Sequence, residues 1–147
     1  MSAEFLSNFM QFSLQTTGAD RGLACDTELS IIAQANLDQV DVMDEKFTGF
    51  ETMRRAFTEG APVITNNAVM DASLAPQTNT NFSNLRVVVV IPLMNCGAIY
   101  LDQPIRRGII SKIIVNKLFT LGNHILENDQ LDISEEGLSQ LYAQMNG

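Results

Sequence analysis

Two strand-like runs separated by two residues stand in the middle of the chain. Leu85–Leu93 reads LRVVVVIPL and Cys96–Asp102 reads CGAIYLD. Aliphatic and β-branched residues continue through both runs, which is typical of strands that protein covers on each face. Asn95 and Gly97 supply the permissive backbone of a tight turn. The runs predict a hairpin at the centre of a sheet, and Pro92, which has no N–H, is expected where the first strand stops pairing.

The length and hydropathy indicate one globular domain. A chain of 147 residues buries roughly two thirds of its unfolded surface as a single domain and leaves no room for a second. No apolar run approaches the ~18 residues of a membrane span, so no membrane contact is expected. Glu4 and Asn8 interrupt what would be the apolar stretch of a signal peptide. A cytoplasmic protein is therefore expected.

The net charge of -8 argues against a nucleic-acid surface, which needs clustered Lys and Arg. A basic concentration does occur at Arg106 and Arg107 with Lys112 and Lys117. A solvated loop and helix face explains these four residues better than a phosphate site does.

Residues that carry out chemistry are few. His124, the one histidine, falls within the apolar period of a helix and is expected to be a packed or surface residue rather than a general base. Cys25 and Cys96 are far apart in the sequence and match no zinc spacing. In a cytoplasmic protein they are expected as free thiols. The sequence predicts no catalytic residue, metal ligand or cofactor.

The two terminal helices carry more apolar surface than one contact can bury. In residues 3–17 the apolar side chains form two stripes, and in residues 109–127 they cover more than one face. One interpretation is a homodimer formed through these helices, because the apolar patch is large for a monomer. The other is that each helix packs on the other and on the sheet. The interface expected for the dimer comprises Phe5, Phe9, Phe12, Leu118, Leu121 and Ile125.

A long polar segment, residues 65–84, separates two predicted strands. It is rich in Asn, Thr and Ser, and connections of this length are often binding loops or lids. A candidate lid and a loop without a ligand remain equally open. After Glu127, Ser134 has the character of an N-cap for a short helix that ends near Met145. The chain is accordingly divided into a domain at 1–128 and a C-terminal linker with a short helix at 129–147.

The order of several phrases resembles that of GAF domains, the sensory and regulatory modules of signalling proteins. The hairpin resembles the family pattern LRSVLxVPL followed by GxLYLD. Thr17–Gly22 reads TGADRG after an amphipathic helix, and Glu59–Val63 reads EGAPV after another. A strand hairpin, Leu23–Cys25 with Leu29–Ala35, lies between them. The resemblance spans nearly the whole chain.

The resemblance implies an α+β fold of GAF/PAS type, with an antiparallel sheet of about six strands flanked by helices on both faces. It also implies a non-enzymatic signal-transduction module that senses a small molecule, mediates dimerisation, or does both, to control an output domain or partner protein. A pocket would form between the sheet and the lid. Its expected residues are Ile32, Gln34, Phe50, Met53, Ile64, Thr65, Asn66, Asn67, Asp71, Ser73 and Val88. A filled pocket in a purely structural dimerisation module is the alternative.

Ligand signatures of particular GAF groups are incomplete in this sequence. Neither cysteine is followed by the histidine usual at a bilin attachment site, since Asp26 and Gly97 follow them. Asn116–Lys117 with Phe119 begins like a cyclic-nucleotide signature but lacks its acidic pair. Enzymes of the family that reduce free methionine sulfoxide need a set of cysteines around the pocket, which two strand cysteines match poorly. Such an enzyme is retained as the alternative of a different class.

Overall fold

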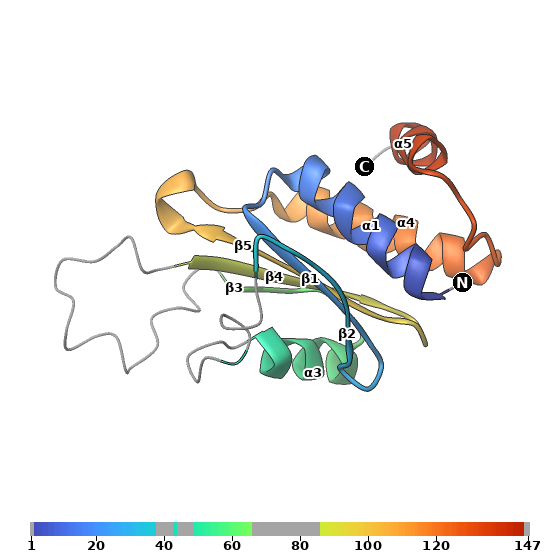
Figure 1. Ribbon diagram of the computed structural model, residues 1–147. Helices are drawn as coiled ribbons and strands as arrows, with labels where there is room; N and C mark the ends of the chain where they lie inside the picture. Colours follow the sequence, from blue (N-terminus) through green and yellow to red (C-terminus); the bar gives the residue numbers. More distant parts are fainter. Residues whose placement is uncertain (1, 38–42, 44–48, 66–85, 146–147) are drawn as a thin grey trace, which may run out of the picture.

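The computed structural model describes residues 2–37, 43, 49–65 and 86–145, and these form an α+β domain (Figure 1). Its described strands make one antiparallel sheet in the order β2-β1-β5-β4-β3. The α+β class is therefore confirmed, with five strands in the described part where about six were expected. The strands are β1 (Arg21–Asp26), β2 (Ile31–Ala35), β3 (Val63–Thr65), β4 (Arg86–Leu93) and β5 (Gly97–Pro104).

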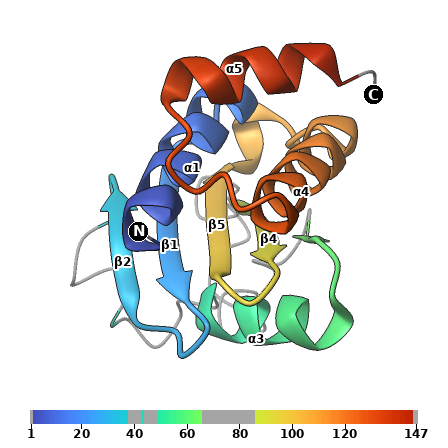
Figure 2. The ribbon, with the colours of Figure 1, turned by 90° about the vertical axis from the view of Figure 1, so that its right-hand side faces the viewer.

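Helices cover both faces of the sheet. The helices α1 (Ser2–Thr17) and α4 (Lys112–Glu127) lie on one face, and α3 (Gly49–Glu59) lies on the other. Figure 2 shows α5 (Glu135–Gln144) lying outside α1 and α4, as a further layer. A short 3-10 helix, η3 (Ile105–Arg107), joins β5 to α4. None of the helices in the described ranges is long and apolar enough to span a bilayer.

The predicted central hairpin is confirmed as β4 and β5. β4 is buried from Val87 to Leu93, and β5 is buried along its whole length. Asn95 and Gly97 have positive φ angles of 55° and 157° at the turn. Pro92 lies inside the strand opposite Ala98, not at the end of pairing as expected. The described β3 pairs with residues 88–90 of β4, so no sheet partner there needs an N–H from Pro92.

Because successive side chains of each strand point to opposite faces, the sheet has a separate hydrophobic core on each face. Val87, Val89 and Ile91 pack with α1 and α4, whereas Val88 and Val90 pack under α3. Successive side chains of a strand point to opposite faces, so both faces of the aliphatic strand are buried. The α3 core is the smaller one and includes Leu23, Cys25, Leu37, Met53, Ala56, Val63, Ala98 and Tyr100.

The six side chains expected at a dimer interface are buried inside the single chain instead. Their exposed fractions lie between 0% and 6%, and all belong to the core beneath α1 and α4. The alternative accounts for this burial, because α1 and α4 pack on each other and on the sheet, and α5 adds a layer on their outer side. Leu138 is fully buried there, and the ring of Tyr142 lies edge-on to Phe12 with 5.7 Å between centroids. The corrected set, Phe5, Phe9, Phe12, Leu118, Leu121 and Ile125, is core, and α5 is part of the packed domain rather than a linker.

Candidate functional site

The described residues of the predicted pocket divide between the two faces of the sheet. Met53 of α3 is fully buried between the helix and the sheet, together with Val88 of β4. Phe50 of α3 packs against the same core. Gln34 pairs with Leu23 of that core and donates its amide to the carbonyl of Leu37 at 2.7 Å. Thr65 is paired with Val88 and donates its hydroxyl to the Val88 carbonyl at 3.2 Å. These five residues lie on the α3 face of the sheet, and their role in a pocket stays a prediction.

Ile32 and Ile64 do not belong to this face. The register between β1 and β2 shifts at Ala24 and Cys25, so that Ile32 becomes the extra residue of a bulge and packs toward α1. Ile64 pairs with Val89, which faces α1 and α4. The GAF resemblance had placed both side chains in the pocket. The remaining pocket predictions, Asn66, Asn67, Asp71 and Ser73, and the candidate lid beyond Thr65 lie outside the described residues.

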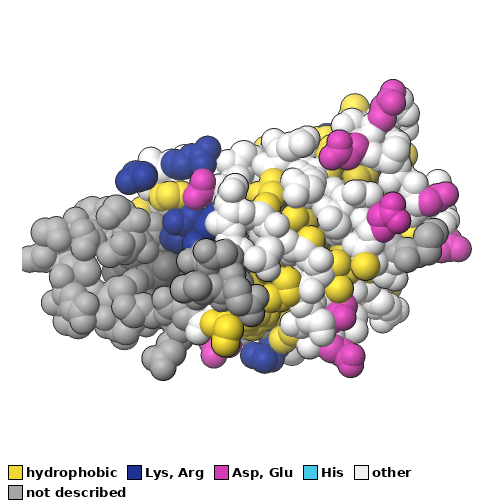
Figure 3. Space-filling view, in the orientation of Figure 1, with side chains coloured by type: hydrophobic (Ala, Val, Ile, Leu, Met, Phe, Trp, Pro, Cys, Tyr) yellow, Lys and Arg dark blue, Asp and Glu magenta, His cyan; other side chains and the backbone are white. Residues whose placement is uncertain are grey.

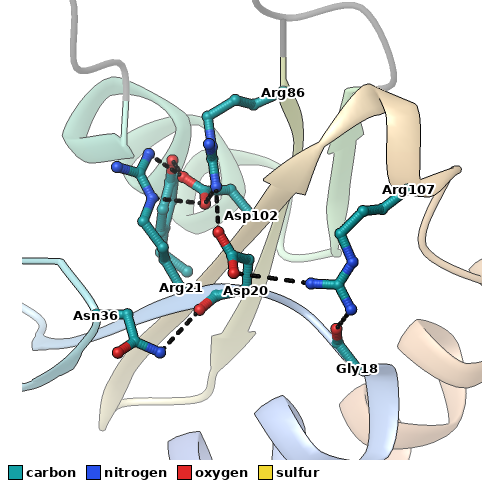
Figure 4. Close-up of polar contacts among 8 residues, drawn as sticks. Gly18, Asp20, Arg21, Asn36, Arg86, Asp102 and Arg107 are labelled. Atoms are coloured by element: carbon teal, nitrogen blue, oxygen red, sulfur yellow. Dashed lines mark hydrogen bonds and ion pairs between the residues drawn. The ribbon is translucent and has the colours of Figure 1, made fainter. Parts of the chain in front are cut away.

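A buried carboxylate forms the polar end of the α3 face. Asp102 of β5 is fully buried and accepts hydrogen bonds from Nε and Nη2 of Arg21, at 2.8 and 2.7 Å (Figure 4). Nη2 of Arg86 approaches the same carboxylate at 2.9 Å, and the hydroxyl of Tyr100 donates to it. Residues from β1, β4 and β5 thus converge on one carboxylate, and we call Asp20, Arg21, Arg86, Tyr100, Asp102 and Arg107 the arginine cluster.

Asp20 links this cluster to the end of α1. Its carboxylate accepts a hydrogen bond from Nη2 of Arg86 at 3.0 Å and lies 3.7 Å from Nη1 of Arg107. Its backbone N–H donates to the carbonyl of Asp102 at 2.9 Å, and Nη2 of Arg107 donates to the carbonyl of Gly18 at 3.2 Å. The turn from α1 into β1 is therefore held by contacts that reach β4, β5 and η3.

The TGADRG phrase has a physical explanation in this turn. Gly18 adopts a φ of 75°, favoured by glycine, and its N–H caps α1 by donating to Leu14 at 2.8 Å. Gly22 lies against the Leu14 side chain, where a Cβ would be 3.1 Å from Cδ1. The cluster joins three phrases of the resemblance, since Arg21 belongs to TGADRG, Arg86 to the first hairpin strand and Asp102 to the second.

Among the residues that the structure describes, three guanidinium groups of the arginine cluster contact two carboxylates, which is one more positive than negative charge in this described set. Nε of Arg86 is buried and has no hydrogen-bond partner among the described residues. Burial, followed by the charge and hydrogen bond of Asp102, raises the pKa of Tyr100 well above its usual range, so its hydroxyl remains a donor.

The sequence interpretation missed these cluster residues. A signal was present, because Arg21, Arg86 and Asp102 are charged residues at the ends of otherwise apolar strands. Each lies two residues from a side chain of the α3 core, namely Leu23, Val88 and Tyr100. A single sequence does not reveal which strands are neighbours, and that relation brings the three charges together.

A groove occupies the opposite end of the molecule, with a volume of about 900 Å³. It lies between the β4–β5 turn, the end of α3 and the second half of α4. Phe57, Pro92, Leu93 and Phe119 form its apolar part, and among the described residues of the predicted pocket none lines it.

The cysteines lack the properties of a nucleophile. Cys25 and Cys96 are free and buried, as expected, and Cys25 is paired with Ala98, two residues from Cys96. Burial, with a smaller effect of Asp26, raises the pKa of Cys25 to about 12, and burial raises the pKa of Cys96. A thiol is nucleophilic as its thiolate, which these environments disfavour. Within the described ranges, no group of three His, Cys, Asp or Glu residues could hold a metal ion.

Comparisons of the chain with protein-family models, with curated proteins and with solved structures find no match.

Proposed function

We propose that this protein is a non-enzymatic regulatory module of GAF/PAS type that binds a small anionic molecule on the α3 face of its sheet. The observation that carries the proposal is the arginine cluster, where Arg21 and Arg86 converge beside an apolar wall. The resemblance of the hairpin and of the TGADRG phrase to GAF domains supports the regulatory part. A ligand carrying a carboxylate or phosphate group fits the charge of this site.

The charge and geometry of the cluster favour an anion. Its described part has one more guanidinium group than carboxylates, in a partly buried region where electrostatic attraction is stronger than in water. Arginine presents N–H donors in a planar fork that matches carboxylate and phosphate oxygens. The buried Nε of Arg86 offers a donor toward such a group. Leaving a buried donor without a partner costs about 1–3 kcal/mol, so a ligand that accepts its hydrogen bond is stabilised.

The neighbouring side chains supply an apolar wall. Met53, Val88 and the ring of Tyr100 are buried on the same face, and Phe50 is half-buried beside them. Small-molecule sites combine such walls with a few convergent polar groups. Met53 adds adaptability, because its unbranched side chain fits different ligand shapes.

The contacts of Asp20 suggest how binding is transmitted. A ligand anion at Arg86 competes with the carboxylates of Asp20 and Asp102 for the same guanidinium group. Asp20 lies in the short connection between α1 and β1, so a change in its ion pairs shifts the end of α1. The ligand favours whichever arrangement of this connection binds it better. The outer surface of α1 and α5 would pass the change to an output domain or partner protein.

The state of the cysteines supports the non-enzymatic form of this proposal over the methionine sulfoxide reductase alternative. Both thiols are buried, and their raised pKa values keep them protonated near neutral pH. The proposal does not include a dimer through the terminal helices, because the side chains expected to form it are core.

The test is a thermal-shift screen of the purified chain against cyclic nucleotides, other nucleotides, and di- and tricarboxylates. A ligand that binds the folded state raises the melting temperature. We expect the rise in melting temperature with the best anion to disappear in Arg86→Met. It should be reduced in Arg86→Lys, which keeps the charge but lacks the planar fork of N–H donors. Arg55→Met is the matched control, since Arg55 is an exposed arginine of α3 paired with Glu59.

Circular dichroism establishes that each variant is folded before ligands are added. An equal loss of the shift in Arg86→Met and Arg55→Met would place the anion elsewhere. A screen in which no anion stabilises the wild-type chain would contradict the proposal.

A further inference from the structure

We propose that the groove at the β4–β5 turn is a second binding site, which takes a small organic cation with an apolar body. This site is independent of the arginine cluster and of the function proposed for it.

The inner side of the groove is rigid. Asn123 of α4 accepts a hydrogen bond from the backbone N–H of Met94 at 2.9 Å, and its amide donates to the carbonyl of Phe119 at 2.9 Å. Gly122 lets the helix approach the hairpin closely, because a Cβ there would be 2.4 Å from Cδ2 of Leu93. The turn and the helix are therefore fixed to one another, and the groove is formed before any ligand arrives.

The outer side comes from the end of α3. Phe57 and Gly60 line the groove there. Gly60 turns the chain with a φ of 64°, and its N–H caps the helix by donating to the carbonyl of Ala56 at 2.8 Å. Phe57 and Phe119 are both half-buried, so each ring presents part of its surface to the groove. Two aromatic rings on different helices provide apolar area and faces that attract cations.

The electrostatic environment of the groove favours a ligand with positive charge. Figure 1 shows the C-terminal ends of α3 and α4 at the same end of the molecule as the β4–β5 turn. A helix C-terminus carries partial negative charge and favours cations. The last turn of α3 has no basic residue, and the last turn of α4 has His124 alone. Glu127 adds a full negative charge, and the described lining includes no Lys or Arg.

The distribution of charged side chains over the surface also favours a cation in the groove. In the view of Figure 3, most Lys and Arg side chains gather at one end, and most Asp and Glu side chains gather at the other. The groove is at the acidic end, since Glu59 and Glu127 are the last residues of α3 and α4 and Asp129 follows α4. A field of one sign raises the local concentration of oppositely charged ligands.

The same region disfavours an extended peptide as the occupant. A peptide strand that extended the sheet would need backbone donors from the open part of β4. Pro92 lies in this part and has no N–H. A volume of about 900 Å³ is within the range of small-molecule sites. The groove therefore fits a compact ligand with an amine or quaternary ammonium group and an apolar or aromatic body.

The test uses the full chain, labelled with ¹⁵N, and three aromatic probes of different charge. Phenyltrimethylammonium is the cation, benzyl alcohol the neutral compound and benzoate the anion. We expect the cation to shift the amide resonances of Asn95, Phe119 and Asn123 and to bind about five-fold or more tightly than benzyl alcohol. Benzoate should bind most weakly.

Two variants with the same change of charge complete the experiment. Glu127→Gln should weaken binding of the cation about five-fold and leave benzyl alcohol unaffected. Glu136→Gln, which alters an exposed residue in the first turn of α5, should leave both unaffected. Equal binding of the cation and benzyl alcohol would overturn the assignment, as would shifts that map away from the groove. An equal effect of the two variants would show attraction to net charge alone.

Discussion

Arg21 binds Asp102 through two hydrogen bonds, and the two residues are also direct partners in the pairing of β1 with β5. The side-chain contact therefore joins strands that are already joined by their backbones. Arg86 of β4 reaches the same carboxylate from the opposite side. One buried charge consequently fixes the relative position of the three central strands, and its guanidinium partners form the proposed ligand site.

The first prediction concerns the stability of this arrangement. Asp102→Asn removes the buried carboxylate that Arg21 and Arg86 share, and we expect it to lower the free energy of unfolding by about 3–5 kcal/mol. Glu59→Gln breaks the exposed pair with Arg55 and should cost less than about 1 kcal/mol. Urea unfolding measures both values. Similar losses in the two variants would show that the buried cluster is not a stabilising unit.

The second prediction concerns the terminal helices. Phe9 is fully buried, so Phe9→Glu places an unpaired charge in the core and should unfold or aggregate the chain. Ile113→Glu, at a side chain that is 71% exposed, should leave the fold intact and change stability by less than about 0.5 kcal/mol. Circular dichroism and sedimentation velocity distinguish these outcomes. A folded, soluble monomer from Phe9→Glu, together with a wild-type dimer, would restore the interface that the sequence suggested.

The third prediction concerns Cys25 at alkaline pH. The pKa of its thiol is raised from 9.0 to about 12 in the fold, so between these values the unfolded chain has lost the proton and the folded chain retains it. Unfolding then releases a proton, and stability falls as the pH rises. Below pH 9 the stabilisation that comes from keeping this thiol protonated is complete. Between pH 9 and about 12 the free energy of unfolding decreases by about 1.4 kcal/mol per pH unit.

Urea unfolding at several pH values measures this slope. Cys25→Ala should be less stable near neutral pH and should show a shallower decrease above pH 9. Alkylation of the native wild-type protein at pH 8 should be slow and should accelerate in urea. Rapid labelling of Cys25 in the native protein would contradict its assignment to the core.

The fourth prediction concerns Gly97 at the start of β5. A Cβ at this position would lie 2.0 Å from the carbonyl oxygen of Cys25, which belongs to the backbone of β1 and has little freedom to move. Gly97→Ala should therefore lower stability by about 3 kcal/mol or more. Gly18→Ala meets no atom within 4 Å and changes only a helix cap, so about 1 kcal/mol is expected. Thermal or urea unfolding that ranks Gly18→Ala as the more damaging change would contradict the close approach of β5 to β1.

Patterns local to the chain predicted much of the fold. The hairpin of β4 and β5 followed from its continuous aliphatic runs, and the N-cap at Ser134 predicted α5 to within a residue at each end. The helix expected over 109–127 begins at Lys112 instead. Gly108 has a φ of 94°, and the side chain of Ser111 caps the first turn, which separates α4 from the residues before it.

Relations between distant segments were not predictable in the same way. Arg21 and Asp102 are 81 residues apart, and their pairing depends on the strand order. The bulge at Ile32 reverses the face that simple alternation assigns to this side chain. The apolar excess of α1 and α4 was correctly recognised, yet the sequence alone left open whether a second chain or packing within the domain covers it.

The central claim is that an anionic ligand binds the α3 face at the arginine cluster. Titration of the ¹⁵N-labelled chain with the anions of the thermal-shift panel tests it most directly, with resonance changes mapped residue by residue. The account predicts saturable shifts at Arg21, Arg86, Val88 and Met53, extending to Asp20 at the end of α1, and predicts their loss in Arg86→Met but not in Arg55→Met. Shifts confined to other surfaces, or none with any anion, would contradict it.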